Sequence, residues 1–357
     1  MKAACYFQHG GAQIDIVHSY PKPILQPGDL LIKVMTASVN PVDIKLHQNN
    51  FRNNVLPLPK VPGRDFCGVV EEMSEPSGRW KIGDRVMGLL PDIFKPWGTC
   101  SEYVSMNELR VVKVPASMSE AEAASLPFVS TVVMQALAPF VDSCEGIINV
   151  TTPGAGGVGS FAIQYCTNVL NMQVTTTCSP NHNDFCTSLG ATAVIDYNKV
   201  KFDDVITDFD VVLDPFSYLY KKRTMNSKVL HANGWYIALK SSPHSLNVFL
   251  RSRKVTSIPE TRSMGVIASK WEHIKVAMGV ARIHYHSVSI VPDEATLPRV
   301  MALVEQGLIH PCVDKTFEME DIMKAHRYVE TGHVQGKVII RVSEGTAINS
   351  DQIQIEN

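Results

Sequence analysis

The strongest candidate for a functional site is a glycine-rich run near the middle of the chain. It follows a predicted strand at residues 147–152 and precedes a predicted helix at residues 161–166. A first glycine allows a tight turn, a second lets backbone N–H groups approach a pyrophosphate, and a third lets the helix pack on the strand, with the helix N-terminus stabilising the anion. The alternative is a glycine-rich turn without a ligand. The spacing predicts a dinucleotide site whose contacts are Gly154, Gly156, Gly157, Val158 and Gly159.

The end of the next strand distinguishes the two nicotinamide cofactors. A carboxylate there binds the ribose hydroxyls of NADH and repels the 2′-phosphate of NADPH. The predicted strand at residues 173–177 has no carboxylate at its end, where Ser179 and His182 follow. A serine hydroxyl donates to phosphate and a histidine carries charge beside it, so these residues favour NADPH. The alternative is that His182 is an exposed histidine at a helix start, with Asp184 as the acid of the first turn.

Length and composition describe an ordinary globular protein. The 357 residues fit about two domains. Hydrophobic residues make up 45% of the chain and charged residues 19%, which excludes a disordered or fibrous protein. The formal net charge of −2 disfavours nucleic acid as a partner. The eight cysteines include no CxxC pair, which argues for a reducing compartment and against a disulfide framework or a four-cysteine zinc site.

The chain also shows no targeting or membrane signal. Its first residues, 1–7, resemble a strand and have neither an apolar signal-peptide core nor an Arg-rich leader. No apolar run reaches the roughly 18 to 20 residues that span a bilayer. We therefore expect a cytoplasmic protein without a membrane span, or a mitochondrial one if a presequence lies outside this sequence.

The pattern of the chain changes near residue 126. Short apolar runs broken by turn residues and prolines in residues 1–125 predict a strand-rich, partly open barrel. Strands alternate with helices in residues 126–290, which predicts a parallel sheet. Residues 291–342 contain a predicted helix and a final strand, and residues 343–357 form a polar tail.

Several runs of the first domain carry a family resemblance. They lie at residues 37–43, 62–70, 83–88, 98–103 and 123–127. Together with the glycine run, they resemble the medium-chain dehydrogenase/reductase superfamily in its zinc-free quinone oxidoreductase, or zeta-crystallin-like, branch. Residues 331–337 and the Gly63-Arg64-Asp65 run are most similar to the reticulon-interacting oxidoreductase subgroup. The resemblance implies an α/β fold in which a GroES-like, partly open β-barrel catalytic domain (1–125, rejoined by 291–342) accompanies a doubly wound Rossmann sheet that binds NADPH (126–290).

The chain departs from the zinc-dependent members of this superfamily at each matching ligand position. Asn40 replaces the first cysteine, Arg64 replaces the histidine, and the third position falls near Pro127. Zinc needs nitrogen or sulfur ligands at fixed spacing, so we expect no metal. The pair His284 and His286 is interpreted as an ordinary strand or loop pair.

The resemblance also implies roles for individual residues, and each role has a structural alternative. Asn40 and Asp43 line the nicotinamide or substrate, or instead form a turn and a helix cap. Lys45 occupies a proton-relay position or is a solvated charge. The cofactor contacts implied by the resemblance, besides the glycine run, are Thr131, Tyr197 beside the 2′-phosphate, and Lys337. Tyr197 has the alternative of a surface aromatic residue.

These residues favour hydride transfer to a conjugated acceptor. Val42 stands where zinc enzymes of the superfamily have a Ser or Thr relay, so no exchangeable proton is available for alcohol oxidation. A quinone or α,β-unsaturated carbonyl delocalises the charge that hydride addition creates and needs less electrostatic stabilisation. We therefore expect an NADPH-dependent quinone or enone reductase.

Other functions stay open. One is a 2-enoyl thioester reductase, disfavoured because residues 40–51 contain no tyrosine donor. Another is a cofactor-binding protein with a protein or RNA partner, for which the basic runs at 221–223 and 251–254 are the candidate surfaces, although a solvated face explains them too. By analogy with relatives we expect a homodimer, with residues 287–291 as the candidate edge strand.

Overall fold

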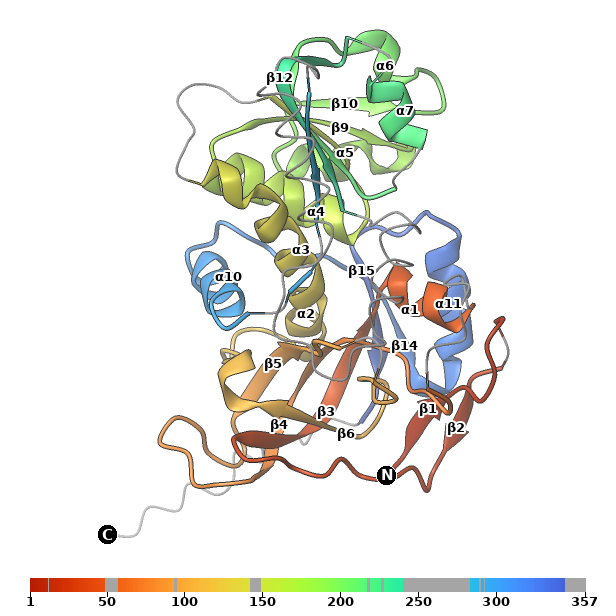
Figure 1. Cartoon of the computed structure of the whole chain (residues 1–357), viewed down its shortest axis with the longest axis vertical. Coiled ribbons are helices and arrows are strands. Elements are labelled where there is room, and N and C mark those ends of the chain that lie inside the picture. Colours follow the sequence, from red (N-terminus) through yellow and green to blue (C-terminus); the bar gives the residue numbers. More distant parts are fainter. Residues whose placement is uncertain are drawn as a thin grey trace, which may run out of the picture.

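The computed structural model describes residues 1–11, 13–48, 57–92, 95–141, 149–216, 219–225, 228–239, 283–288, 290–291 and 293–343. Two bodies of secondary structure are stacked along the long axis of the molecule (Figure 1). One is a barrel-like, mostly antiparallel sheet, and the other is a parallel sheet. The predicted α/β fold class, with a GroES-like domain and a Rossmann-type domain, is confirmed.

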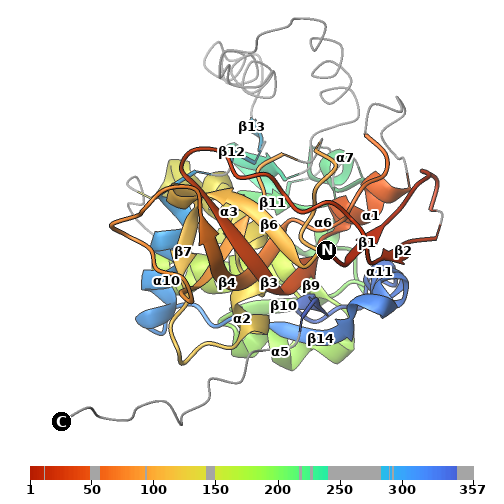
Figure 2. The same cartoon turned by 90° about the horizontal axis from the view of Figure 1, so that it is seen from below.

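The first body is built around the long strand β3 (Asp29–Val39), which is buried along most of its length. Its seven-stranded sheet has the order β14-β15-β3-β4-β5-β7, and β6 also pairs with β3. The other strands are β4 (Asp65–Met73), β5 (Arg85–Leu89), β6 (Tyr103–Asn107), β7 (Val111–Lys113), β14 (Val313–Glu318) and β15 (Lys337–Arg341). A separate hairpin of β1 (Ala3–Cys5) and β2 (Asp15–Val17) lies beside this sheet, as the view from below shows (Figure 2).

The C-terminal part of the chain crosses back to this first sheet. Strand β15 pairs with β3, with Val338 opposite Val39, although about 300 residues of sequence separate them. The predicted final strand, 336–342, is observed as Lys337–Arg341. This return brings the start of β15 to the boundary between the two sheets.

The second body is a six-stranded parallel sheet of order β10-β9-β8-β11-β12-β13. Its strands are β8 (Asn149–Pro153), β9 (Gln173–Cys178), β10 (Ala193–Asp196), β11 (Phe209–Asp214), β12 (Leu230–Ala238) and β13 (His284–Ser287). The strand order reverses between β8 and β11. In such sheets ligands bind in the crevice outside the carboxyl ends of the strands at this reversal. The glycine run follows β8 directly and therefore lies at that crevice.

Helices cover and connect the sheets. They are α1 (Pro41–His47), α2 (Glu120–Ser125), α3 (Pro127–Leu137), α4 (Gly157–Gln164), α5 (Asn183–Ser188), α6 (Phe202–Val205), α7 (Leu219–Met225), α10 (Thr296–Glu305) and α11 (Ile322–Glu330). Short 3₁₀ turns occur at Glu108–Arg110, Ala138–Phe140, Pro180–His182 and Met319–Asp321, and a π-helical turn at Tyr165–Val169 continues α4. Helix α2 begins with a capping box, in which the Ser119 hydroxyl accepts from the Glu122 backbone N–H.

The predicted start of the helix after the glycine run is wrong by four residues. Helix α4 begins at Gly157, inside the run, because Gly156 adopts the extended conformation of an N-cap. The unpaired N–H groups of the first helical turn therefore belong to the glycine run itself.

A continuous core joins the two bodies. Met87 of β5, Val133 of α3 and Val150 of β8 are fully buried members of one apolar cluster. Helix α3 thus packs against both sheets. Close packing of this kind transmits displacements between the elements that it joins, so the site at the boundary is held in place by both sheets.

Candidate active site

The glycine run is shaped for close contact with a ligand. A side-chain carbon at Gly159 would lie 2.0 Å from the Pro153 carbonyl oxygen, and one at Gly154 would lie 2.2 Å from Thr176 Oγ1. These two glycines are required for the turn and for helix packing. A carbon at Gly156 would meet no atom within 4 Å. The run therefore has an open face at Gly156, bordered by the N–H groups of α4, and a pyrophosphate fits there.

The residues expected to recognise the 2′-phosphate gather at the carboxyl ends of β9 and β10. Ser179 Oγ lies 3.2 Å from His182 Nδ1, and the Tyr197 N–H bonds to the Cys178 carbonyl, one residue before Ser179. Tyr197 is 45% exposed, so its ring is open to a ligand. A carboxylate that sequence analysis did not consider, Asp196, ends β10, and Lys199 lies 3.6 Å from its oxygen. The charge of Asp196 is thus offset by a neighbouring cation.

A buried polar network lies at the boundary between the sheets, and Asp65 is its centre. One oxygen of Asp65 accepts from Ser38 Oγ at 2.5 Å and from Asn40 Nδ2 at 2.8 Å, and Lys337 Nζ lies 3.3 Å from the same oxygen. The other oxygen accepts from the Phe128 N–H at 2.7 Å. Asp65 is fully buried and Lys337 is 5% exposed. Burial lowers the pKa of Lys337, and the charge of Asp65 opposes that shift.

Lys337 links this network to the glycine run. Its side chain passes so close to Gly157 that a side-chain carbon there would lie 2.6 Å from Lys337 Cδ. Its ammonium donates to Asn40 Oδ1 at 2.7 Å and to the Val39 carbonyl at 3.1 Å. The Gly336 N–H bonds to the Ala155 carbonyl at 2.8 Å. Lys337 therefore contacts both Asn40 and the glycine run.

Asn40 and Asp43 form a capping box at the start of α1, so Asp43 has the helix-cap role given as its alternative, whereas Asn40 is the N-cap and not the turn residue given as its alternative. Asn40 is the N-cap of α1, Pro41 occupies the first helical position, and the Asp43 carboxylate accepts from the Asn40 N–H at 2.8 Å. The amide of Asn40 has a fixed orientation because Lys337 bonds its oxygen and Asp65 bonds its nitrogen. Asn40 therefore acts on the site through the groups that it positions.

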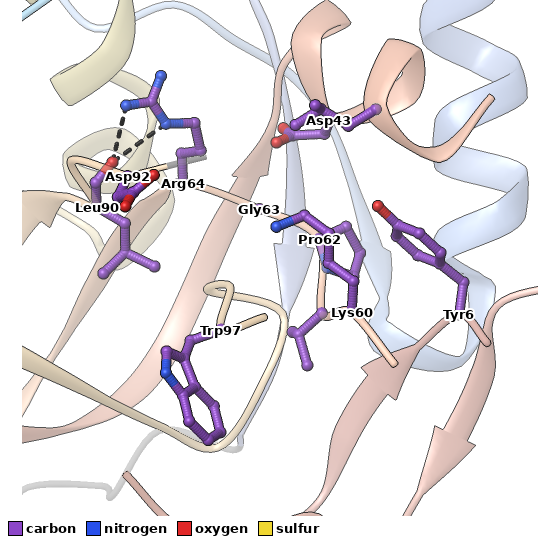
Figure 3. Close-up of a pocket in the computed structure, with 11 residues that line it drawn as sticks. Tyr6, Asp43, Lys60, Pro62, Gly63, Arg64, Leu90, Asp92 and Trp97 are labelled. Atoms are coloured by element: carbon purple, nitrogen blue, oxygen red, sulfur yellow. Dashed lines mark hydrogen bonds between the residues drawn. The ribbon is translucent and has the colours of Figure 1, made fainter. Parts of the chain in front are cut away.

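A pocket lies beside this network (Figure 3). Its polar lining residues are Tyr6, Asp43, Lys60, Arg64 and Asp92, and Trp97 forms an apolar wall. The exposed fractions of the Asp43 and Lys60 side chains are both 3%. Burial raises the pKa of Asp43 to about 6, with the Asn40 N–H and the charge of Arg64 opposing the shift. Burial lowers the pKa of Lys60 to about 8, with Asp43 and Asp92 opposing it.

Arg64 is a buried cation on the side of the pocket that faces α3. Its guanidinium donates to the Leu90 carbonyl at 2.8 and 3.1 Å and to the Pro91 carbonyl at 3.2 Å, and it lies 5.4 Å from the centre of the Phe128 ring. Burial lowers the pKa of this group. Two backbone carbonyls therefore hold a positive charge where zinc enzymes of the superfamily place a ligand histidine.

Two expected site residues do not line the pocket. Thr131 is buried in α3, and its hydroxyl donates to the Pro127 carbonyl at 2.7 Å. Lys45 is half-buried on α1 and does not line the pocket. Among the described residues, no group of three or more His, Cys, Asp and Glu side chains is arranged to hold a metal ion.

Sequence analysis did not assign Asp65, Lys60 or Tyr6 to the site. The sequence could have indicated Asp65, because this carboxylate begins the apolar run at residues 65–70 and a buried charge needs partners. Tyr6 and Lys60 gave no such signal. They reach the pocket only because they pair across two strand-like segments far apart in the sequence.

The geometry shows two sheets joined by one core, with a glycine-rich loop and a polar pocket near their boundary, and the following comparisons with known proteins bear on its class. The alcohol dehydrogenase GroES-like domain family matches residues 26–116, and the zinc-binding dehydrogenase family matches residues 189–340. The chain is 29% identical to the 2-methylene-furan-3-one reductase of Solanum lycopersicum, over 95% of this chain and 79% of that one. It is 28% identical to the mitochondrial NAD(P)H oxidoreductase RTN4IP1 of Mus musculus, over 90% and 83% of the two chains.

A solved structure gives the same result. The quinone oxidoreductase from Coxiella burnetii superposes with a TM-score of 0.75 at 27% identity, covering 96% of this chain and 99% of that one. The chain belongs to the medium-chain dehydrogenase/reductase superfamily and is quinone oxidoreductase-like. By class it is an NAD(P)H-dependent oxidoreductase. No helix among the residues that the structure describes is long and apolar enough to cross a membrane.

Proposed function

We propose that the protein transfers hydride from NADPH to a quinone or an α,β-unsaturated carbonyl compound without zinc. The observation that carries this proposal is Lys337, whose stem covers Gly157 of the cofactor loop while its ammonium bonds Asn40 beside the polar pocket. The loop that binds the cofactor and the pocket that binds an acceptor thus meet at one side chain. Bound NADPH supplies the hydride at C4 of its nicotinamide, and the chain positions the acceptor against it.

NADPH is favoured over NADH by the end of β9. Ser179 and His182 offer donors to a 2′-phosphate, and Tyr197 lies beside them. The contacts proposed for the rest of the cofactor are the glycine run, Lys337 beside it and Thr131 of α3.

A conjugated acceptor is favoured by the charges of the pocket. Arg64 provides a fixed positive charge for the negative charge that hydride addition creates, and carbonyl groups already orient it. Val42 on α1 provides no proton relay for an alcohol. Asp43 closes the pocket and caps Asn40, and we keep Lys45 as the remaining candidate from α1.

The names of the relatives support the same acceptor class. They include a 2-methylene-furan-3-one reductase, an NADPH-dependent alkenal/one oxidoreductase of Arabidopsis thaliana and quinone oxidoreductases. The second candidate remains a 2-enoyl thioester reductase. The tyrosine that residues 40–51 lack is provided in the pocket by Tyr6.

The test is NADPH consumption with one ortho-quinone, one para-quinone and one enal, and NADP⁺ reduction with a short alcohol. We expect turnover of quinone or enal and none of the alcohol. Tight NADPH binding with no turnover of any acceptor would contradict the proposal and favour a binding function. A crotonyl thioester in the same panel tests the second candidate.

Replacing Ser179 with Asp is expected to shift the cofactor preference toward NADH at least about tenfold, because a carboxylate at this strand end repels a 2′-phosphate and accepts from ribose hydroxyls. The measurement is kcat/KM for both cofactors at fixed acceptor. Ser188→Asp adds the same charge at an exposed site of α5 and should leave the preference unchanged. An unchanged ratio in Ser179→Asp would place the 2′-phosphate elsewhere.

We also propose a homodimer. In the described parallel sheet, β13 (His284–Ser287) is one of the two edge strands. The edge proposed for pairing therefore lies slightly earlier than the expected residues 287–291. Residue 289 lies outside the described residues. A monomer mass by light scattering at micromolar concentration would contradict it.

An RNA partner stays disfavoured. Arg223 pairs with Asp203, and residues 251–254 lie outside the described residues. We keep the cytoplasm as the proposed compartment, with mitochondria as the alternative.

A further inference from the structure

The pocket contains a buried hydroxyl without a partner. Tyr6 is fully buried, lines the pocket, and its hydroxyl makes no hydrogen bond in the structure. Burying a hydroxyl without a partner costs about 1 to 3 kcal/mol. Phenylalanine would fill the same space without that cost. Because Tyr6 lines the pocket, a ligand bound there would give this hydroxyl the partner that it lacks.

Lys60 is fixed beside Tyr6 by the backbone. The two residues exchange both backbone hydrogen bonds, each 3.0 Å long, in an antiparallel bridge. Residues directly opposite in such a pair have their side chains next to each other on one face. Figure 3 shows Tyr6, Lys60 and Asp43 around the same pocket, where the Lys60 ammonium donates to the Lys95 carbonyl. A neutral donor, the Tyr6 hydroxyl, and a cation, the Lys60 ammonium, therefore belong to the same pocket.

We propose that the Tyr6 hydroxyl binds the carbonyl oxygen of the acceptor and, backed by Lys60, delivers the proton that completes reduction. This inference rests on the proposed function and adds its proton donor. It also restricts the substrate to acceptors that carry a carbonyl oxygen conjugated to the carbon that accepts hydride.

The step balances. The hydride adds to the β-carbon of an enone with both of its electrons, and the π electrons of the double bond move onto the carbonyl oxygen. That oxygen takes the proton of the Tyr6 hydroxyl, the phenolate takes a proton from the Lys60 ammonium, and Lys60 regains one from solvent. The resulting enol tautomerises to the saturated ketone, and one NADPH and one proton are consumed. For a quinone, the same electron flow gives a hydroquinone monoanion that takes one proton.

The electrostatics of the pocket suit these roles. Burial raises the pKa of Tyr6, with the charge of Asp43 adding to the effect, so the hydroxyl stays protonated and donates at neutral pH. Lys60 has a pKa of about 8 because of burial, and Asp43, Asp92 and Arg64 are the charged groups that act on it. A group that must be protonated loses its function as the pH rises through its pKa. Activity should therefore fall above pH 8, and this alkaline limb should disappear in Lys60→Met.

The decisive variant is Tyr6→Phe, with Tyr165→Phe as its control. Tyr165 is also fully buried and its hydroxyl also lacks a partner, but it lies in the cofactor domain outside the pocket. We expect Tyr6→Phe to keep or raise its melting temperature and to keep its NADPH affinity while kcat/KM for 2-cyclohexen-1-one and menadione falls about 10- to 100-fold. Tyr165→Phe should likewise keep or raise its melting temperature, and its NADPH affinity and kcat/KM should match the wild type.

A binding measurement separates failure of this inference from failure of the proposed function. Trp97 lines the pocket, so its fluorescence reports a ligand there, with Trp97→Phe as the signal control. The probe is 1,4-hydroquinone, which needs no turnover. If the wild type reduces no acceptor but Tyr6→Phe binds the probe more weakly, the binding site for the carbonyl oxygen is retained and the proposed reaction is overturned. Wild-type kcat/KM and probe binding in Tyr6→Phe, or a lowered melting temperature with unchanged kcat/KM, would overturn this inference alone.

Discussion

Gly156→Ala is expected to fold as the wild type does and to bind NADPH at least about tenfold more weakly, a loss of roughly 1.4 kcal/mol. Gly156 has a φ of −75°, which alanine adopts without strain, and its side-chain carbon would meet no protein atom within 4 Å. Removing a glycine at a compatible position adds a few tenths of a kcal/mol of stability. The added methyl group therefore lies in the space that we assign to the pyrophosphate.

Gly159→Ala is the matched contrast. Its side-chain carbon would lie 2.0 Å from the Pro153 carbonyl oxygen and 2.6 Å from that of Gly154, which are backbone atoms that cannot move aside separately. We expect a loss of about 3 kcal/mol in the free energy of unfolding, at the upper end for overpacked sites. Thermal unfolding and a fluorescence titration with NADPH measure both variants. Unchanged NADPH affinity in Gly156→Ala would show that the cofactor does not lie on this loop.

Lys337→Met is expected to lower the free energy of unfolding by about 3 to 5 kcal/mol, because it leaves Asp65 buried without its cation. Asp65 is fully buried, and Lys337 Nζ lies 3.3 Å from its oxygen. The double variant Asp65→Asn with Lys337→Met should recover part of the loss, since it buries no charge and the amides of positions 40 and 65 can reorient to bond each other. Chemical denaturation of the four proteins gives the coupling energy of the pair.

The control for this cycle is Lys324→Met, which removes an exposed lysine that pairs with Asp321 on the surface at 2.8 Å. Surface pairs contribute between 0 and about 1 kcal/mol. Equal effects of Lys324→Met and Lys337→Met, or additive effects within the cycle, would show that Lys337 and Asp65 do not depend on each other.

Local signals in the sequence sufficed to predict the glycine-rich loop between β8 and α4, which we propose binds the cofactor. The glycines, the flanking strand and the following helix lie within about twenty residues, and the physical requirements of a tight turn and close phosphate approach act over that distance. The capping role of Asp43 was readable for the same reason, since a capping box involves residues three apart. The start of α4 was misjudged because glycine has a low helix propensity, and packing against the sheet overrides that preference.

The pocket that we propose binds the acceptor could not be predicted from such local signals. Tyr6, Lys60 and Arg64 come from three separated segments, and no periodicity connects them. Lys337 was expected near the cofactor, but its bonds to Asn40 and Asp65 depend on β15 pairing with β3 across about 300 residues. Asn40 was expected to line the site, and its bonds to Asp65 and Lys337 could not be read from the sequence.

By itself the sequence determined the class of fold, the glycine-rich turn between β8 and α4 and the absence of a carboxylate at the end of β9, because each depends on neighbouring residues. The tertiary structure alone decided which charges share the pocket, which of them are neutralised and which hydroxyl is left without a partner. Burial and long-range strand pairing set those properties, and both arise only when distant segments pack together.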